Sequence, residues 1–242
     1  MSNILMALKK NQIEILIDYR YEHKFLVSHL NRNEIENIVK FHPAMFHKIY
    51  YKRNINNIYF DTADFSSYID NIEGVRDRRK VRIRWYGDLL GVCKDPVLEI
   101  KYKKGLLGWK ERHNLPDSSL YLESRFNFKG IFEELVKNKS FDLYKLDLQF
   151  LTPTLLNRYE RTYYLSFDKK YRITLDSKIE FYSINPIRDY FKTYCDEEKT
   201  VVELKYDQQY DDGARGITEH FPFRVTKNSK YVIGIDRIIN WK

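Results

Sequence analysis

Cysteine is scarce in this sequence: Cys93 and Cys195 are the only two in 242 residues. They lie far apart, with neither a CxxC motif nor a histidine at ligand spacing, which argues against a disulfide framework and a zinc site. The six histidines, among them His42 and His47, also lack companions at metal-ligand spacing. We therefore expect a protein of a reducing compartment without a histidine- or cysteine-bound metal.

Long hydrophobic runs are missing as well. No stretch approaches the roughly 20 apolar residues of a membrane span. The short apolar run at residues 4–8 has no charged segment before it and no small-residue cleavage site. Without internal repeats or low-complexity linkers, residues 1–242 are predicted to form a single cytoplasmic domain that has no membrane segment and is large enough to bury a core.

Several catalytic and binding signatures are also absent. The spacing Gly-x-x-Gly-x-Lys at residues 105–110 differs from that of a phosphate-binding loop and falls between predicted strands, so it indicates a hairpin turn. No serine or cysteine nucleophile arrangement stands out. RNP-type and KH-type signatures are missing, and this disfavours RNA binding.

Positive charge is abundant. The formal net charge is +8, and charged residues make up 31% of the chain. Such an excess indicates an anionic partner, which could be nucleic acid, an acidic membrane surface or phosphate. Net charge does not distinguish among these partners, but the placement of the basic residues does.

Alternation of polar and apolar residues with a period of two predicts eight strands. They cover residues 19–28, 56–62, 79–86, 97–103, 109–115, 157–166, 172–182 and 200–206. Helices are predicted at 34–41, capped by Asn31 or Asn33, and at 126–135 and 143–150, with connecting loops at 183–198 and 207–222. The predicted fold class is α+β, a closed antiparallel β-barrel of about eight strands with flanking helices.

Five of these strands carry charge along one face, since side chains at i and i+2 point the same way. The faces are Arg20, Glu22 and Lys24; Lys80, Arg82 and Arg84; Glu99, Lys101 and Lys103; Glu203 and Lys205; and Arg172, Thr174, Asp176, Lys178 and Glu180. For any single strand, a solvated outer face explains the pattern. The recurrence of Arg-x-Arg and Glu-x-Lys favours a hydrated lumen that holds a polyanion, because buried unpaired cations are prohibitively costly.

Acidic residues on these faces would repel a phosphate chain unless a cation bridges the two. Mg²⁺ and Mn²⁺ bind through one or two carboxylates together with substrate phosphates. Glu203, Glu22 and Glu99 are therefore candidate ligands of a divalent metal. The alternative, equally open for Glu99, is pairing with adjacent lysines and arginines.

Eight motifs, in this order, carry a family resemblance. They are YEHK (21–24), IYFDT (58–62), RKVRIRWYG (79–87), LEIK (98–101), YERT (159–162), RITLD (172–176), VELK (202–205) and KNSKY (227–231), with Lys110 and Arg112 after the fourth. The chain resembles the VTC domain, the polyphosphate polymerase domain of the CYTH or triphosphate tunnel metalloenzyme superfamily, over a core of about 19–236.

The resemblance implies residue roles in a phosphate tunnel. Residues expected to grip the reacting phosphates are Lys24, Arg82, Arg84, Lys101, Arg161 and Arg172. Lys227, Lys230 and Ser229 are further matches to the family's phosphate-binding residues, and Lys205, Lys110 and Arg112 complete the expected substrate-binding set. Glu203 matches the family's metal-binding glutamate.

One departure bears on the reaction. The wider superfamily begins with Glu-x-Glu-x-Lys, whereas Arg20 occupies the first of these positions here, which favours a polymerase over a triphosphatase. The expected function is Mn²⁺- or Mg²⁺-dependent transfer of the γ-phosphoryl group of ATP to phosphate or a growing polyphosphate chain. The alternatives are hydrolysis of triphosphates on the same fold, or a non-catalytic module that binds polyphosphate or RNA.

Overall fold

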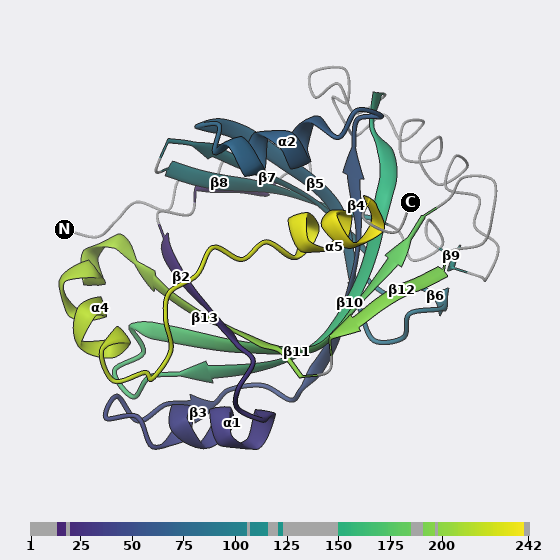
Figure 1. Ribbon diagram of the computed structural model, residues 1–242. Coiled ribbons are helices and arrows are strands. Elements are labelled where there is room, and N and C mark those ends of the chain that lie inside the picture. The colour runs from purple at the N-terminus through teal and green to yellow at the C-terminus, as the bar shows by residue number, and fades with distance from the viewer. Residues whose placement is uncertain are drawn as a thin grey trace.

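A computed structural model describes residues 14–17, 20–105, 107–115, 121–122, 150–184, 191–196 and 198–239. Most strands belong to one antiparallel sheet that curls into an open half-barrel (Figure 1). In order across the sheet they are β1 (Glu14–Ile17), β8 (Leu107–Asn114), β7 (Val97–Lys104), β5 (Asp77–Tyr86), β4 (Arg53–Asp61), β10 (Thr152–Leu165), β11 (Tyr171–Ser183), β13 (Thr200–Asp207) and β2 (Arg20–Val27).

Short elements complete the architecture. β3 (His47–Lys48) pairs with β10, β12 (Phe191–Asp196) pairs with β11, and β6 (Gly91–Val92) pairs with β9 (Tyr121–Leu122). The helical elements are α1 (Arg32–Lys40), α2 (Ser66–Glu73), η4 (Gln208–Tyr210), α4 (Asp211–Thr218) and α5 (Lys230–Ile239). Figure 1 shows α5 inside the curl of the sheet, with α1 and α4 outside it.

Strand alternation divides the core between the two faces of the sheet. On the outer face, Phe25 and Ile173 pack in one cluster with Ile35 of α1 and Ile217 of α4. On the concave face, Leu155 and other apolar side chains pack against α5. That cluster comprises Ile55, Tyr59, Leu155, Tyr159, Ile179, Phe181, Val201, Tyr231 and Ile235. The helix α5 therefore fills part of the concavity, and charged side chains line the rest.

The predicted helix at 34–41 is confirmed, and it begins two residues earlier, at Arg32. The Asn31 side chain accepts hydrogen bonds from the backbone amides of Asn33 and Glu34, while Glu34 accepts one from the Asn31 amide at 2.7 Å. This reciprocal capping box satisfies amides that the first helical turn leaves without partners.

Two loop predictions are wrong. Residues 207–222 contain η4 and α4, and residues 183–198 contain β12. The apolar residues Ala214 and Ile217 of α4 are buried against the sheet, and this packing supports a helix despite two glycines in its sequence. The predicted helices at 126–135 and 143–150 lie outside the described residues, apart from residue 150.

The predicted barrel closure is not confirmed. Among the described strands, β1 and β2 are the two ends of the order and do not pair with each other. Each of the eight predicted strands overlaps an observed one, but the sheet also contains β1, β3 and β12, which the alternation did not predict.

A β-bulge corrects the predicted charged face on β11. The register with β10 shifts between Arg158 and Glu160, and Lys178 adopts a φ of 49°. An extra residue in one strand reverses the side-chain alternation beyond it. Lys178 therefore pairs with Glu160 at 3.2 Å, away from Asp176 with which the sequence pattern grouped it.

Within the part of the chain that the structure describes, none of the helices combines the length and apolar character needed to cross a membrane.

Candidate active site

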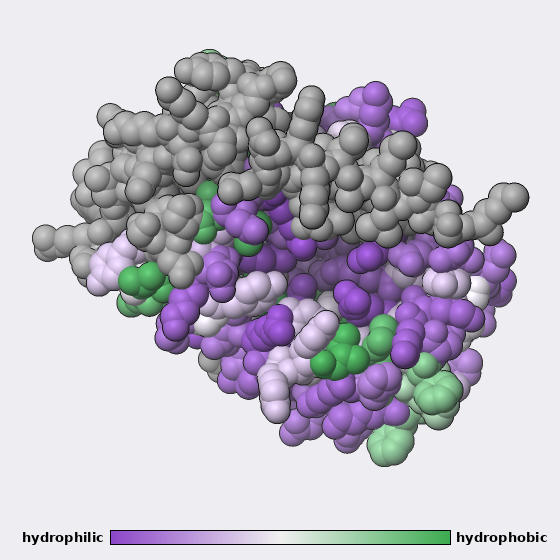
Figure 2. Space-filling model, turned by 180° about the vertical axis from the view of Figure 1, so that it is seen from behind, coloured by the Kyte–Doolittle hydropathy of each residue, from purple (hydrophilic) through white to green (hydrophobic). Residues whose placement is uncertain are grey.

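Charged side chains of seven strands, namely β2, β5, β7, β8, β10, β11 and β13, and of the first residue of α5 converge on the concave face of the sheet. Figure 2 shows a recessed region of hydrophilic residues on one face of the molecule. The contacts on this face form three groups, which are centred on the buried carboxylates of Glu203, Asp176 and Glu99.

Glu203 on β13 is the most highly connected carboxylate. Its oxygens lie 2.7 Å from Nζ of Lys205, 3.7 Å from Nζ of Lys24, 3.4 Å from Nη2 of Arg161 and 3.8 Å from Nζ of Lys230. Burial raises the pKa of Glu203, but the surrounding cations outweigh burial and hold it well below the usual range. Glu203 is therefore ionised, and cations of β2, β10 and α5 surround its carboxylate.

Asp176 on β11 is the second carboxylate and is completely buried. It accepts hydrogen bonds from Nε and Nη2 of Arg161 at 2.5 and 2.6 Å and from Nζ of Lys230 at 2.5 Å. Burial raises its pKa, whereas Arg161 and Lys230 lower it further, so that the net shift is downward. Asp176 thus fixes the orientation of Arg161 and Lys230, which are both predicted to bind phosphate.

Glu22 and Lys24 on β2 lie at the edge of this group. Nζ of Lys24 is 2.9 Å from Glu22 and donates to the carbonyl of Asn228 at 3.0 Å. Burial and Glu203 raise the pKa of Glu22, but Lys205, Lys24 and Lys101 lower it to about 2. Glu22 also lies 3.9 Å from Nζ of Lys101 on β7, and this contact spans the opening of the half-barrel.

Glu99 on β7 forms a separate group with arginines. It accepts from Arg82 at 2.8 and 2.5 Å and from Nε of Arg112 at 3.2 Å, and it lies 3.7 Å from Nη1 of Arg84. Burial raises the pKa of Glu99, but Arg82 and Arg84 lower it strongly. In this structure Glu99 pairs with arginines, which is the alternative that the sequence left open.

Tyr159 and Asn57, two functional candidates that sequence reasoning missed, connect these groups. The Tyr159 hydroxyl accepts from Nη2 of Arg84 at 3.4 Å, and Nζ of Lys230 lies 4.7 Å from its ring centroid. Burial raises the Tyr159 pKa, yet Arg161 and Arg84 produce a net decrease. The Asn57 side chain accepts from Nε of Arg84 at 2.9 Å. Tyr159 precedes Arg161 by two residues in a strand, and this spacing was the available signal.

The N-terminus of α5 faces the same region. Ser229 immediately precedes the helix, and its hydroxyl accepts from Nζ of Lys80 at 2.9 Å. Helix N-termini favour anions because their first amides lack partners and the helix dipole is positive there. Burial lowers the pKa of Lys80, and Lys24 and Lys101 lower it further, to about 7.

The remaining predicted residues lie nearer the rim. Arg172, Lys101 and Lys227 are exposed. Arg172 is opposite Lys205 in the β11–β13 register, and Lys110 is opposite Lys101 in the β7–β8 register. The structure therefore gathers the buried predicted residues closely and leaves these four at the edge of the concave face.

A divalent metal at this site would need carboxylate ligands that lie close together. The described residues contain no group of three or more His, Cys, Asp or Glu that could hold a metal ion. Glu22 on β2 and Glu203 on the adjacent strand β13 both contact Lys24. Mg²⁺ characteristically uses one or two carboxylates together with substrate phosphates. These two residues fit a metal of that kind, whereas the three arginines around Glu99 do not favour one there.

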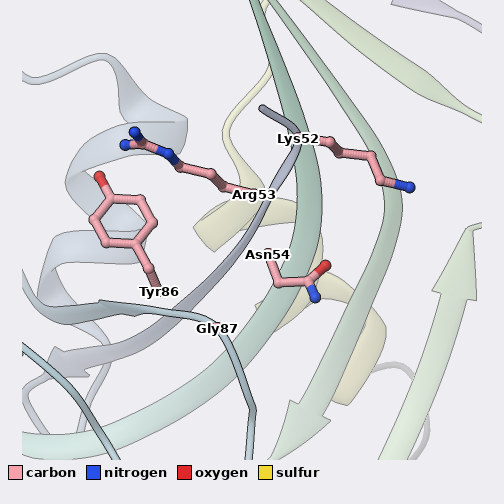
Figure 3. Close-up of a pocket in the computed structure, with 5 residues that line it drawn as sticks. All are labelled: Lys52, Arg53, Asn54, Tyr86 and Gly87. Carbon is pink, nitrogen blue, oxygen red and sulfur yellow. The ribbon is translucent and has the colours of Figure 1, made fainter. Parts of the chain in front are cut away.

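A separate pocket of about 430 Å³ lies beside the start of β4 and the end of β5 (Figure 3). It is lined by Lys52, Arg53, Asn54, Tyr86 and Gly87. None of these is a predicted site residue, and the guanidinium of Arg53 lies over the Tyr50 ring at 4.9 Å. We place the site on the concave face, where the ionised groups converge, and not in this pocket.

The family model of the VTC domain matches residues 19–239. No curated protein matches the chain. A candidate adenylate cyclase from Bacillus halodurans has a similar structure, with a TM-score of 0.50 and 14% identity over 89% of this chain and 95% of that one. At this identity the likeness shows the fold alone.

Two further structures are similar at lower scores. A candidate adenylate cyclase from Vibrio parahaemolyticus has a TM-score of 0.48 and 11% identity, with 89% of this chain and 98% of that chain covered. A candidate adenylyl cyclase from Hippeastrum, described as having a dominant triphosphatase activity, has a TM-score of 0.47 and 13% identity, with coverage of 89% and 94%.

Proposed function

The chain belongs to the VTC domain family, and on that premise we propose that it transfers the γ-phosphoryl group of ATP to phosphate or to the end of a polyphosphate chain. The observation that carries the proposal is the surplus of cations over carboxylates on one concave face. The cations are Lys24, Lys80, Lys205, Lys230, Arg82, Arg84, Arg112 and Arg161, and the carboxylates are Glu22, Glu99, Asp176 and Glu203.

The arginines and lysines would bind and align the phosphates. Phosphoryl transfer needs little covalent help from a protein, so positioning and charge neutralisation account for most of the catalysis. Arg82, Arg84 and Arg161 would hold the γ-phosphoryl group, and Arg172 would reach it from the rim, since guanidinium groups bind phosphate oxygens two at a time. Glu99 keeps Arg82 and Arg84 in place before substrate arrives, and Asp176 does the same for Arg161.

Glu203 and Glu22 would hold Mn²⁺ or Mg²⁺, whose charge, when the ion is bound, neutralises phosphate oxygens. In the reaction, an oxygen of the acceptor phosphate attacks the γ-phosphorus in line. The bond from this phosphorus to the β,γ-bridging oxygen breaks, ADP leaves, and the acceptor gains one phosphate. The positive end of α5 and Lys230 would offset the charge on the transferred group.

We also propose that the half-barrel closes into a tunnel around this substrate. Its end strands β1 and β2 are separated by two residues in the sequence. The contact of Glu22 with Lys101 already connects β2 to β7 across the opening, and a phosphate chain bound among both sets of cations would join these edges further.

Product analysis tests the proposal. The protein is incubated with ATP, Mn²⁺ and a short polyphosphate primer, and products are resolved on a polyphosphate gel with nucleotides separated in parallel. Longer chains together with ADP are expected. Arg84→Gln should abolish most of this synthesis, whereas Arg215→Gln, a change on the exposed surface of α4, should leave it unchanged.

Hydrolysis is the second candidate, because the same residues would align a water molecule as acceptor. Release of phosphate or pyrophosphate without chain growth would contradict the polymerase and support a triphosphatase. Binding of polyphosphate without any turnover would indicate a binding module. Release of pyrophosphate with cyclic AMP would instead match the activity for which all three of these similar structures are named.

A further inference from the structure

Like charges lie directly opposite each other at one end of the β5–β7 ladder. Arg82 is opposite Glu99, but the next two pairs on this face are Lys80 with Lys101 and Arg78 with Lys103. Like-charged pairs directly opposite in an antiparallel sheet are destabilising. The ladder thus changes from an ion pair to two repulsive pairs as it leaves the central site, and a bound anion would relieve this repulsion.

The two repulsive pairs form a row of cations, and a pocket of about 210 Å³ lies at its outer end, beside Arg78 and Lys103. Its lining consists of Gly74, Arg76, Arg78, Lys103 and Gly105, without a carboxylate. Gly105 has a φ of 60°, and a Cβ there would meet the Arg76 guanidinium at 3.4 Å, so the backbone and this cation approach closely. The pocket offers positive charge and little bulk, as a phosphate-binding pocket requires.

The cations of this row differ from those of the central site in their partners. Among the described residues, no carboxylate lies within ion-pair distance of Arg78, Lys80 or Lys103, whereas Glu203, Asp176 and Glu99 each pair with several cations. Arg78 donates to the Val75 carbonyl at 2.7 Å. Burial lowers the pKa of Lys103, and Arg78 and Lys227 lower it further, so this amino group lies among cations.

We propose that Arg78 and Lys103 form a second anion subsite, which continues the concave site outward through Lys80 and holds the distal phosphates of a linear polyphosphate chain. This inference rests on the proposed function, in which the central site holds the reacting end of that chain. Single-stranded RNA fits less well, because the pocket lining has no aromatic ring on which bases could stack.

Binding measurements at two chain lengths test the subsite. Tripolyphosphate and long-chain polyphosphate are titrated against the protein without divalent metal, using wild type and the double variant Arg78→Gln/Lys103→Gln. Tripolyphosphate reaches only the central site, so its Kd should change by less than about twofold. The Kd for the long chain should rise roughly tenfold or more, because two charge-assisted contacts are lost.

The matched control is Lys40→Gln/Arg215→Gln, which removes the same charge from α1 and α4. It should leave both affinities within about twofold of wild type, because long-range surface charge is screened at physiological salt. Thermal unfolding of each variant checks folding. If the double variant unfolds, Arg78→Gln and Lys103→Gln are measured singly, and each should weaken long-chain binding alone.

The outcomes separate this inference from the proposed function. Wild type that binds neither phosphate would contradict the proposed function itself. Tight binding of both by wild type, with no selective loss in the variant, would overturn only the outer subsite. Equal loss for both chain lengths would assign Arg78 and Lys103 to the central site. RNA that binds with the same selective loss would identify a nucleic-acid surface instead.

Discussion

Asp176 illustrates how single carboxylates organise the cations of this protein. It is fully buried, and within the part of the chain that the structure describes its hydrogen-bond partners are two cations, Arg161 on β10 and Lys230 on α5. Sequence alternation placed Asp176 on a charged face but gave no partner for it. Its partner on β10 depends on the β10–β11 register, and its partner on α5 depends on tertiary packing, so neither could be derived from local sequence.

Asp176→Asn should destabilise the protein strongly. Removing one member of a buried ion pair leaves the other charges without compensation, at a cost of about 3–5 kcal/mol. Urea unfolding would measure this loss. The control Asp64→Asn, at an exposed position, should change the free energy of unfolding by less than about 0.5 kcal/mol. A similarly small effect for Asp176→Asn would contradict the role of this carboxylate.

Lys80 should make stability depend on pH. Its pKa in the folded protein is about 7, below the ordinary value of 10.5, because of burial and the positive groups Lys24, Lys101, Arg78 and Arg82. Between pH 7 and 10.5 the unfolded chain binds more protons, so stability rises with pH in this window. Below pH 7 the destabilising contribution of Lys80 is fully present.

Lys80→Met removes this contribution. The variant should be more stable than wild type at pH 6.5, as measured by urea unfolding, and its advantage should shrink as pH rises from 7 towards 10. It should also bind tripolyphosphate less tightly, since the lysine would otherwise take up a proton and contact phosphate. A stability difference that is independent of pH would show that Lys80 is not neutralised by folding.

Period-two alternation predicted eight of the nine strands in the order from β1 to β2 and missed β1 itself, whereas most helices escaped prediction. The sequence of α5, KYVIGIDRII, is rich in β-branched residues, which favour strands locally. Its burial against Leu155 and Phe181 overrides that preference. The bulge at Lys178 has no local sequence signal either, because lysine rarely adopts a positive φ.

Gly234 allows α5 to pack closely on the sheet. A Cβ at this position would lie 2.4 Å from Cδ2 of Leu155 and 2.7 Å from Cδ1 of Phe181, both of which are buried. Gly234→Ala should therefore lower the free energy of unfolding by about 1–3 kcal/mol, despite the better helix propensity of alanine. Phosphate binding should weaken as well, because Lys230 begins the same helix.

Gly216→Ala on α4 is the matched control. No atom lies within 4 Å of the added methyl group, so helix propensity alone should act and raise the free energy of unfolding by up to about 1 kcal/mol. Chemical denaturation of both variants gives the comparison. If Gly234→Ala were also stabilising, α5 would not be tightly packed in the concavity.

For the whole molecule, the sequence predicted which cations share the concave face but not how they are held. Arg82, Arg84 and Lys24 followed from alternation along their strands. Tyr159 was missed because its contact with Arg84 joins β10 to β5, with β4 between them. The strand order of the open sheet, which ends at β1 and β2, likewise depends on pairing between strands far apart in the sequence. Strand patterns leave this pairing undetermined.

An open sheet with surplus positive charge on its inner face should be stabilised by multivalent anions. A ligand that binds only the folded state raises stability by about 2.7 kcal/mol at 100 times its Kd, which corresponds to a Tm increase of roughly 5–10 °C for a protein of this size. Tripolyphosphate should produce this shift in thermal unfolding, whereas sodium chloride at equal ionic strength should produce a much smaller one. Equal shifts would mean that general screening relieves the repulsion, and the concave face would then lack a specific polyanion site.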